Sequence, residues 1–238
     1  MSIFSNLTNN GLEEQKDTLG GFTLLDSDIY PAKIKVAYAG RSASGAMNVT
    51  IHADINGKEY RETIYITNKD GINFYEKDGK KIPLAGFAVV NDICQLAAGK
   101  PLSQMDTEDK MLMIYSTELQ KEVATKVPVL MDLLDTRVDL GIVKEKRFKA
   151  VKDSNGNYVD SDEIRESNVI NKAFHPETHQ TVYEIAHNLN DSPLFYDKWL
   201  DKNKGQVMDR TRKGGRTGGN NMVSPSAPQR TERKSLFN

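Results

Sequence analysis

The chain has 238 residues, of which 38% are hydrophobic and 27% charged, with a formal net charge of −1. This composition supplies enough apolar material for a folded core and excludes a wholly disordered protein. No apolar run approaches the roughly 18 residues that a membrane helix needs, and no basic start followed by an apolar stretch marks a secretory signal. The single cysteine, Cys94, excludes an intrachain disulfide and a multi-cysteine metal site. We therefore expect a soluble, cytoplasmic protein without a cofactor.

The charge is unevenly distributed along the chain. Residues 202–238 hold nine basic residues against two acidic ones, a charge of +7, while the preceding part holds 23 basic and 31 acidic residues, a charge of −8. The end of the chain is also rich in Gly and Arg and has no apolar periodicity, which is typical of disorder. We predict a flexible N-terminal arm over residues 1–20, one folded domain over 21–205 and a disordered basic tail over 206–238.

Three strands are predicted at the start of the domain, over residues 29–38, 47–55 and 58–67, because apolar and polar residues alternate in each. In the first strand, the alternation assigns Ile34, Val36 and Tyr38 to one face, with Lys33 and Lys35 on the other. Asn56-Gly57 between the second and third strands is typical of a type I′ hairpin turn. The three strands should therefore form a meander.

The later elements follow in the order helix, strand, strand. Apolar residues at helical spacing predict a helix over residues 87–98, and Gly99 is well placed to end it. Met111–Tyr115 is a short apolar run. Two further strands are expected over residues 127–134 and 140–151. Extra strands are expected over 168–174 and 181–186, and a short helix over 194–202.

This order of elements is that of the OB-fold. We predict a mainly β protein with an OB-fold-like, five-stranded, partly open barrel, one inserted helix, extra hairpins and a C-terminal helix. Other small barrels and sandwiches use similar strands and remain alternatives.

No catalytic constellation is evident in the sequence. His175 and His179 are four residues apart, but Pro176 stands where the zinc-protease motif requires Glu. The acidic clusters at residues 106–109 and 160–163 could hold magnesium for a nuclease, although solvated loops explain them more simply. We predict that the protein is not an enzyme and binds no metal.

Basic and aromatic residues are interleaved on the predicted strands and loops. Single-stranded nucleic acid is bound by positive grooves that follow the phosphates and by aromatic faces on which bases stack. This pattern predicts a nucleic-acid interface, although each residue alone could equally be an ordinary surface or core residue. The candidate residues are Lys33, Lys35, Arg61, Tyr65, Lys69, Phe74, Tyr75, Lys77, Lys144, Lys146 and Phe148.

Several separated blocks resemble the single-stranded-DNA-binding proteins of lytic tailed bacteriophages. The blocks are R-E-T-I-Y-I-T-N-K-D-G (61–71), N-F-Y (73–75), P-L-A-G-F-A-V-V-N-D-I-C-Q-L-A-A-G-K-P-L (83–102) and F-Y-D-K-W-L-D-K-N-K-G (195–205). The resemblance implies an OB-fold core, no enzymatic activity and a location in the host bacterial cytoplasm. It also implies that the protein coats exposed strands during replication, recombination and repair. Tyr75 is the stacking contact that it assigns.

The tail departs from the acidic tails that many such proteins carry. It ends in T-E-R-K-S-L-F-N (231–238), in which Lys234, Leu236 and Phe237 form a candidate hook for replication, recombination or transcription proteins. Two alternatives to a DNA-coating protein therefore stay open. One is an adaptor that recruits or activates a polymerase, with DNA binding secondary; the other is a metal-dependent recombination nuclease.

Overall fold

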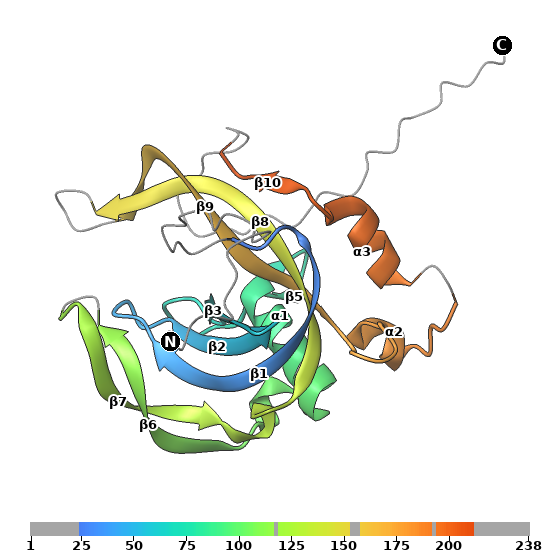
Figure 1. The fold of residues 1–238 in the computed structure, drawn as a ribbon, viewed down its shortest axis with the longest axis horizontal. Helices are drawn as coiled ribbons and strands as arrows, with labels where there is room; N and C mark the ends of the chain where they lie inside the picture. Colours follow the sequence, from blue (N-terminus) through green and yellow to red (C-terminus); the bar gives the residue numbers. More distant parts are fainter. Residues whose placement is uncertain (1–23, 117–118, 153–157, 192–193, 212–238) are drawn as a thin grey trace, which may run out of the picture.

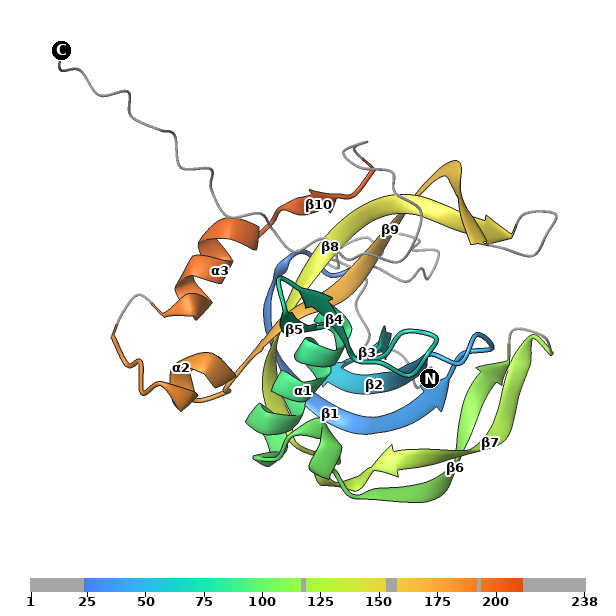
Figure 2. The ribbon, with the colours of Figure 1, turned by 180° about the vertical axis from the view of Figure 1, so that it is seen from behind.

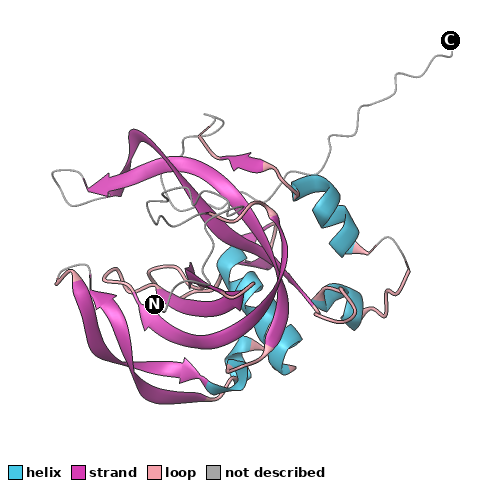
Figure 3. Cartoon of the chain, in the orientation of Figure 1, coloured by secondary structure: helices cyan, strands magenta, loops and turns pink. Residues whose placement is uncertain are grey.

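The computed structural model describes residues 24–116, 119–152, 158–191 and 194–211. Of these residues, 53% lie in strands and 19% in helices, so the protein is mainly β, as predicted (Figure 3). The strands are β1 (Asp28–Arg41), β2 (Met47–Ile55), β3 (Lys58–Tyr65), β4 (Phe74–Lys77), β5 (Lys80–Pro83), β6 (Thr107–Ser116), β7 (Lys121–Leu130), β8 (Arg137–Lys152), β9 (Tyr158–Phe174) and β10 (Val207–Asp209). The α-helices are α1 (Ala85–Ala98), α2 (Val182–Ala186) and α3 (Phe195–Asn203), and short 3₁₀ helices span Leu102–Gln104 and Met131–Leu133.

Strand β1 is central to one eight-stranded sheet. It pairs antiparallel with β8 through residues 28–33 and with β2 through residues 33–41, and β2 pairs with β3. β7 pairs with β1 at one position and with β6 along its whole length. β8 also pairs with β9 and, in parallel, with β10. Among the described strands β3 and β9 do not pair, so the sheet does not close into a barrel.

Two long hairpins extend from this sheet. In Figure 1 the β8–β9 hairpin runs above the β1–β3 meander and the β6–β7 hairpin below it, and both project to the same side. A separate two-stranded hairpin, β4–β5, precedes α1 and lies between the meander and the crossing of β8 and β9 in Figure 2. The hairpins are therefore the parts of the fold that stand out from its core.

Strand β1 contains a bulge that the sequence pattern does not reveal. The register with β2 shifts between Ile34 and Val36, which leaves Lys35 as the extra residue. The bulge reverses the alternation, so Ile34 and Ala37 are fully buried in the main core while Val36 and Tyr38 pack in a different cluster. The prediction that Ile34, Val36 and Tyr38 share one face is therefore wrong.

Helix α1 covers the main core between the meander and β8–β9. It buries Val90 and Ile93 against these strands. A Cβ at Gly86 would lie 2.1 Å from the carbonyl oxygen of Tyr65, so only glycine allows the helix to approach the end of β3 this closely. Gly99, with a φ of 69°, ends the helix as predicted.

Helix α3 covers a second, smaller core on the other side of β8. Trp199, 4% exposed, packs with Ile29, Val143 and Phe174, and its indole N–H donates a hydrogen bond of 2.9 Å to the side-chain oxygen of Asn171. The strand pair β8–β9 is thus covered on both faces at this end. No helix among the described residues has the length and apolar composition needed to cross a membrane.

Segment 181–186, which the sequence predicts as a strand, forms helix α2 instead. Thr181 and Glu184 make a capping box: the Glu184 N–H donates to the Thr181 hydroxyl, and the Thr181 N–H donates to the Glu184 carboxylate. These two bonds satisfy backbone donors at the start of a helix. The local cap therefore starts a helix where the sequence analysis expects a strand.

Two predicted boundaries also change. The strand expected over residues 127–134 is the end of β7, which stops at Leu130 before a 3₁₀ turn. β10 lies inside the range predicted as disordered tail, yet it pairs in register with residues 144–146 of β8. The folded chain therefore extends past residue 205, while the predicted N-terminal arm and residues 212–238 lie outside the described part.

The open edge between β3 and β9 is bridged by one side chain, Glu62. Its Oε2 atom accepts hydrogen bonds of 2.7 Å from the Tyr60 hydroxyl and of 2.7 Å from the backbone N–H of Ile170 on β9. Burial raises the pKa of the Glu62 carboxyl to about 7, although both hydrogen bonds and the charge of Arg147 act to lower it. This bridge therefore includes an acid that titrates near neutral pH.

The raised pKa predicts a loss of stability as the pH rises. The folded state holds the Glu62 proton more tightly than the unfolded state, so its stabilising effect is complete near pH 4 and is lost as the pH passes 7. Glu62→Gln keeps an acceptor oxygen but no charge. At pH 8 its free energy of unfolding should exceed that of the parent by on the order of 1–3 kcal/mol. Urea unfolding at several pH values between 5 and 8 measures this free energy for both proteins. If it changes with pH to the same extent in the parent and in Glu62→Gln, the prediction is contradicted.

Candidate nucleic-acid interface

The β4–β5 hairpin brings together the strongest candidates. Its turn is made by Asp78 and Gly79, with φ values of 52° and 70°, as a type I′ turn requires. The register pairs Phe74 with Pro83, Tyr75 with Ile82, Glu76 with Lys81 and Lys77 with Lys80. Because side chains alternate along a strand, one face of the hairpin carries Tyr75, Lys77, Lys80 and Ile82. We call this the Tyr75 face.

The Tyr75 face is positively charged at its tip. Lys77 and Lys80 are exposed and directly opposite each other, and no ion pair neutralises either within the described residues. The nearby acids do not share this face, since Glu76 is on the other side and Asp78 is in the turn. Like charges directly opposite each other destabilise a strand pair, so the two lysines do not contribute to folding stability. An anionic ligand bound between them would relieve their repulsion.

The two aromatic residues of the hairpin have different environments. Tyr75 is 39% exposed on the charged face. Phe74 is half-buried on the opposite face, with the Lys81 ammonium 4.6 Å from its ring centre. A base can therefore stack on Tyr75, whereas the ring of Phe74 is already covered by a cation.

A second group of candidates lies on the outer face of β3. Arg61 and Tyr65 share this face, and Tyr65 is 54% exposed. Between them Thr63 shares a hydrogen bond of 2.8 Å with Thr50 on β2. Arg61 lies opposite His52, whose Nε2 atom is buried without a hydrogen-bond partner in the described part of the chain. This face offers an aromatic ring and a cation, as predicted.

The other predicted lysines near the meander are scattered. The Lys33 ammonium lies 2.7 Å from Asp135, and this hydrogen bond lowers the pKa of the Asp135 carboxyl. Lys35 is exposed at the bulge of β1, and Lys69 is exposed in the turn after β3. Lys33 is thus partly neutralised, and the structure does not gather these three side chains into one patch.

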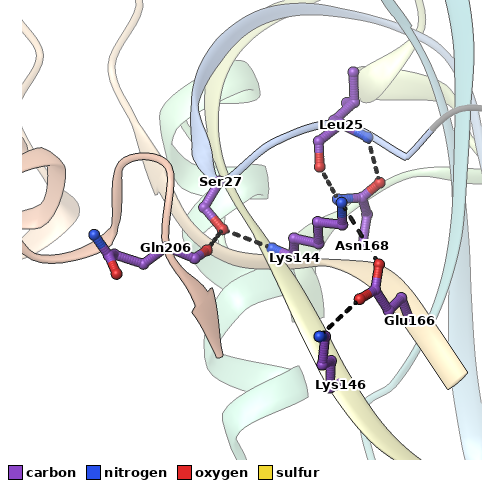
Figure 4. Close-up of polar contacts among 7 residues, drawn as sticks. All are labelled: Leu25, Ser27, Lys144, Lys146, Glu166, Asn168 and Gln206. Carbon is purple, nitrogen blue, oxygen red and sulfur yellow. Dashed lines mark hydrogen bonds and ion pairs between the residues drawn. The ribbon is translucent and has the colours of Figure 1, made fainter. Parts of the chain in front are cut away.

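The predicted residues of β8 are mostly engaged with the protein itself. Figure 4 shows the Glu166 carboxylate between Lys144 and Lys146, with N–O distances of 3.5 and 3.2 Å. The backbone N–H of Lys144 also donates to the Ser27 hydroxyl. Phe148 is half-buried opposite Ile164. These residues fix the β8–β9 hairpin, and the single Glu166 carboxylate balances one of the two lysine charges.

Two residues of the Tyr75 face, Ile82 and the cation Lys80, are absent from the sequence-based set, and Lys80 is the one that matters for charge. The signal that could have identified it is the Asp78-Gly79 turn, because a two-residue loop fixes which residues pair on either side. The candidate partner hook Lys234, Leu236 and Phe237 lies outside the described residues.

The acidic clusters considered for magnesium are dispersed by ion pairs. Asp106 pairs with Lys100 at 3.2 Å, and Glu163 pairs with Lys149 at 2.8 Å. The described residues contain no group of three or more His, Cys, Asp or Glu side chains that could hold a metal ion. His175 serves a turn, where its Nδ1 atom accepts from two backbone N–H groups.

Comparisons with known proteins give no match to this chain among protein-family models, curated proteins or solved structures.

Substitutions on the two faces of the β4–β5 hairpin should have opposite effects on stability. Lys80→Glu places a carboxylate opposite Lys77 and should stabilise the protein by about 0.2–1 kcal/mol. Lys81→Glu, the matched control, places a carboxylate opposite Glu76 and removes the cation from Phe74, so it should destabilise the protein. Thermal unfolding of both variants measures the difference. Equal melting temperatures, or a reversed order, would contradict the described register and faces.

Proposed function

We propose that this protein is a non-catalytic single-stranded-DNA-binding protein that coats and protects exposed strands during phage DNA replication, recombination and repair. The observation that carries the proposal is the Tyr75 face, on which an exposed aromatic ring lies beside two lysines that form no ion pair with any residue that the structure describes. Base stacking on such a ring is worth about 1–3 kcal/mol and tolerates any sequence, because every base has a π-face. The basic tail adds phosphate contacts and recruits protein partners in this proposal.

An OB-fold-like core is part of the same proposal. A three-stranded meander, a helix and then the long β8–β9 pair, which returns to β1, support it. The Glu62 bridge lies at the β3–β9 edge, where a closed barrel would pair. OB-folds bind oligonucleotides on the face of their second and third strands, which here carries Arg61 and Tyr65.

The negative charge of the body is compatible with DNA binding. Phosphates respond to the local potential of the surface that they contact rather than to the net charge of the protein. The Tyr75 face presents Lys77 and Lys80, with Glu76 turned to the other side. DNA should therefore bind at the hairpin despite a charge of −8 before residue 202.

The decisive test is binding of a dye-labelled thymidine oligomer, followed by fluorescence anisotropy. Intrinsic tryptophan fluorescence is unsuitable because Trp199, on α3, is buried against Ile29, Val143 and Phe174. Tyr75→Ala should raise Kd by about 5- to 150-fold, the equivalent of one lost stack, while Tyr75→Phe should bind like the parent. Removing Lys77 or Lys80 should reduce the slope of log K against log salt by about 0.7 per phosphate contact.

Tyr183→Ala is the matched aromatic control. Tyr183 is 63% exposed but lies on α2, away from the hairpin, so its loss should leave Kd unchanged. Equal effects of Tyr75→Ala and Tyr183→Ala, or no binding by the parent at low salt, would contradict the proposed function.

A further inference from the structure

Three arginines from neighbouring strands lie in a row across the β8–β9 hairpin. Arg147 on β8 is directly opposite Arg165 on β9. Arg210 directly follows β10, and its backbone N–H donates a 2.8 Å hydrogen bond to the carbonyl oxygen of Lys146. Since β10 is the strand next to β8, the three residues occupy adjacent positions on β9, on β8 and directly after the end of β10. We call them the arginine row.

One buried carboxylate serves two of these arginines. Glu145 is 2% exposed, and its Oε1 atom contacts the Arg147 guanidinium while its Oε2 atom lies 3.6 Å from Nε of Arg210. Both guanidinium-bearing side chains remain about half exposed, at 50% and 49%. Two cations therefore share one anion and still face solvent.

The third arginine, Arg165, forms no ion pair within the described residues. Arg165 is exposed, and no acidic side chain in the described part of the chain forms an ion pair with it. Burial, and then the positive charges of Arg210 and Arg165, lower the pKa of the Arg147 guanidinium; Glu62 and Asp160 act in the opposite direction. Folding alone gives no reason to place Arg165 directly opposite Arg147, because like charges in that position are destabilising.

The arrangement suits a ligand with repeated negative charges. Guanidinium groups form bidentate hydrogen bonds with phosphate oxygens. Neighbouring strands are about 4.8 Å apart, so the row presents several fixed cations along a line rather than one enclosed pocket. The sequence continues from Arg210 with Arg212, Lys213 and Arg216, which extends the basic character.

We propose that the arginine row binds the phosphodiester backbone of single-stranded DNA at a site separate from the Tyr75 face. This inference rests on the proposed function and adds to it a contact that uses phosphates and no base stacking. Arg165 is the residue that identifies the site, because it serves no ion pair of the described structure.

Two oligomers of equal length distinguish binding at this site from binding at the Tyr75 face. One is a thymidine oligomer, and the other is an abasic oligomer that has phosphates but no bases. Arg165→Gln should raise Kd about fivefold for both oligomers and reduce the salt slope by about 0.7 for each. Tyr75→Ala should weaken only the thymidine oligomer. Arg165→Lys, which keeps the charge, should retain the salt slope of the parent.

Stability and charge controls complete the experiment. Arg165→Gln should melt at or above the temperature of the parent, because it removes a like-charge contact. Lys121→Gln removes one exposed cation from the β6–β7 hairpin and should change Kd less than twofold. A melting temperature several degrees lower for Arg165→Gln would show a structural role and overturn the inference.

The remaining outcomes distinguish the two proposals. If the parent binds thymidine through Tyr75 but Arg165→Gln leaves Kd and salt slope unchanged, the arginine row is not a binding site and the proposed function stands. If the parent binds neither oligomer at low salt, the proposed function fails and the inference fails with it.

Discussion

The exchange of partners along β1 is the constraint on which the rest of the structure depends. One half of this strand pairs with β8 and the other with β2, and the bulge at Lys35 lies just after the change. A strand that serves two partners in this way bends the sheet around a single core. Because the bulge reverses the alternation, the same strand also supplies Tyr38 to the cluster that anchors the β6–β7 hairpin. The meander and both long hairpins therefore take their positions from β1.

Like charges lie directly opposite each other at several positions of the sheet, but Lys33, opposite Arg137, pairs with Asp135, and Glu59, opposite Asp54, pairs with His52. Two other places leave at least one of the opposed cations without an ion pair in the described residues, Lys77 with Lys80 and Arg147 with Arg165. Both are on hairpins that extend beyond the main core. On β4–β5 the nearby Glu76 lies on the opposite face, and on β8–β9 the single carboxylate of Glu145 is shared by two arginines. Natural proteins break local rules of stability chiefly at functional sites. An anionic polymer that contacts both hairpins would offset the repulsion at each. The two sites then have different tasks, since the β4–β5 hairpin adds the exposed aromatic ring of Tyr75.

Local signals in the sequence account for the elements that were predicted correctly. Asn56-Gly57 specifies the turn between β2 and β3, and Gly99 ends α1, because each acts within a few residues. The errors come from interactions that a local pattern does not contain. The Lys35 bulge depends on pairing with β2, and β10 depends on a parallel partner about 60 residues earlier, which no alternation in three residues reveals. Helix α2 is different, since its T-x-x-E capping signal is local and present in the sequence at residues 181–184.

The candidate site shows the same division. The placement of Tyr75 on the same face as Lys77 and Lys80 follows from the Asp78-Gly79 turn and could have been predicted from the sequence. The ion pairs of Lys144 and Lys146 with Glu166 could not be predicted from the sequence, because they depend on the register of β8 with β9. The row formed by Arg147, Arg165 and Arg210 joins three strands and could be recognised only in the fold.

Photochemical crosslinking of the full chain to a thymidine oligomer, with tryptic mapping of the attached nucleotide, tests the central claim most directly. Cleavage after Lys69 and Lys77 releases residues 70–77 as one peptide, which contains Tyr75. The account predicts that the crosslink lies in this peptide and on Tyr75, the aromatic ring beside the unpaired lysines. Residues 111–121 form a second tryptic peptide, which carries Tyr115, 49% exposed on β6 and so equally accessible to a base. Crosslinks confined to that peptide would contradict the account, because exposure without the charged hairpin would then be sufficient for binding.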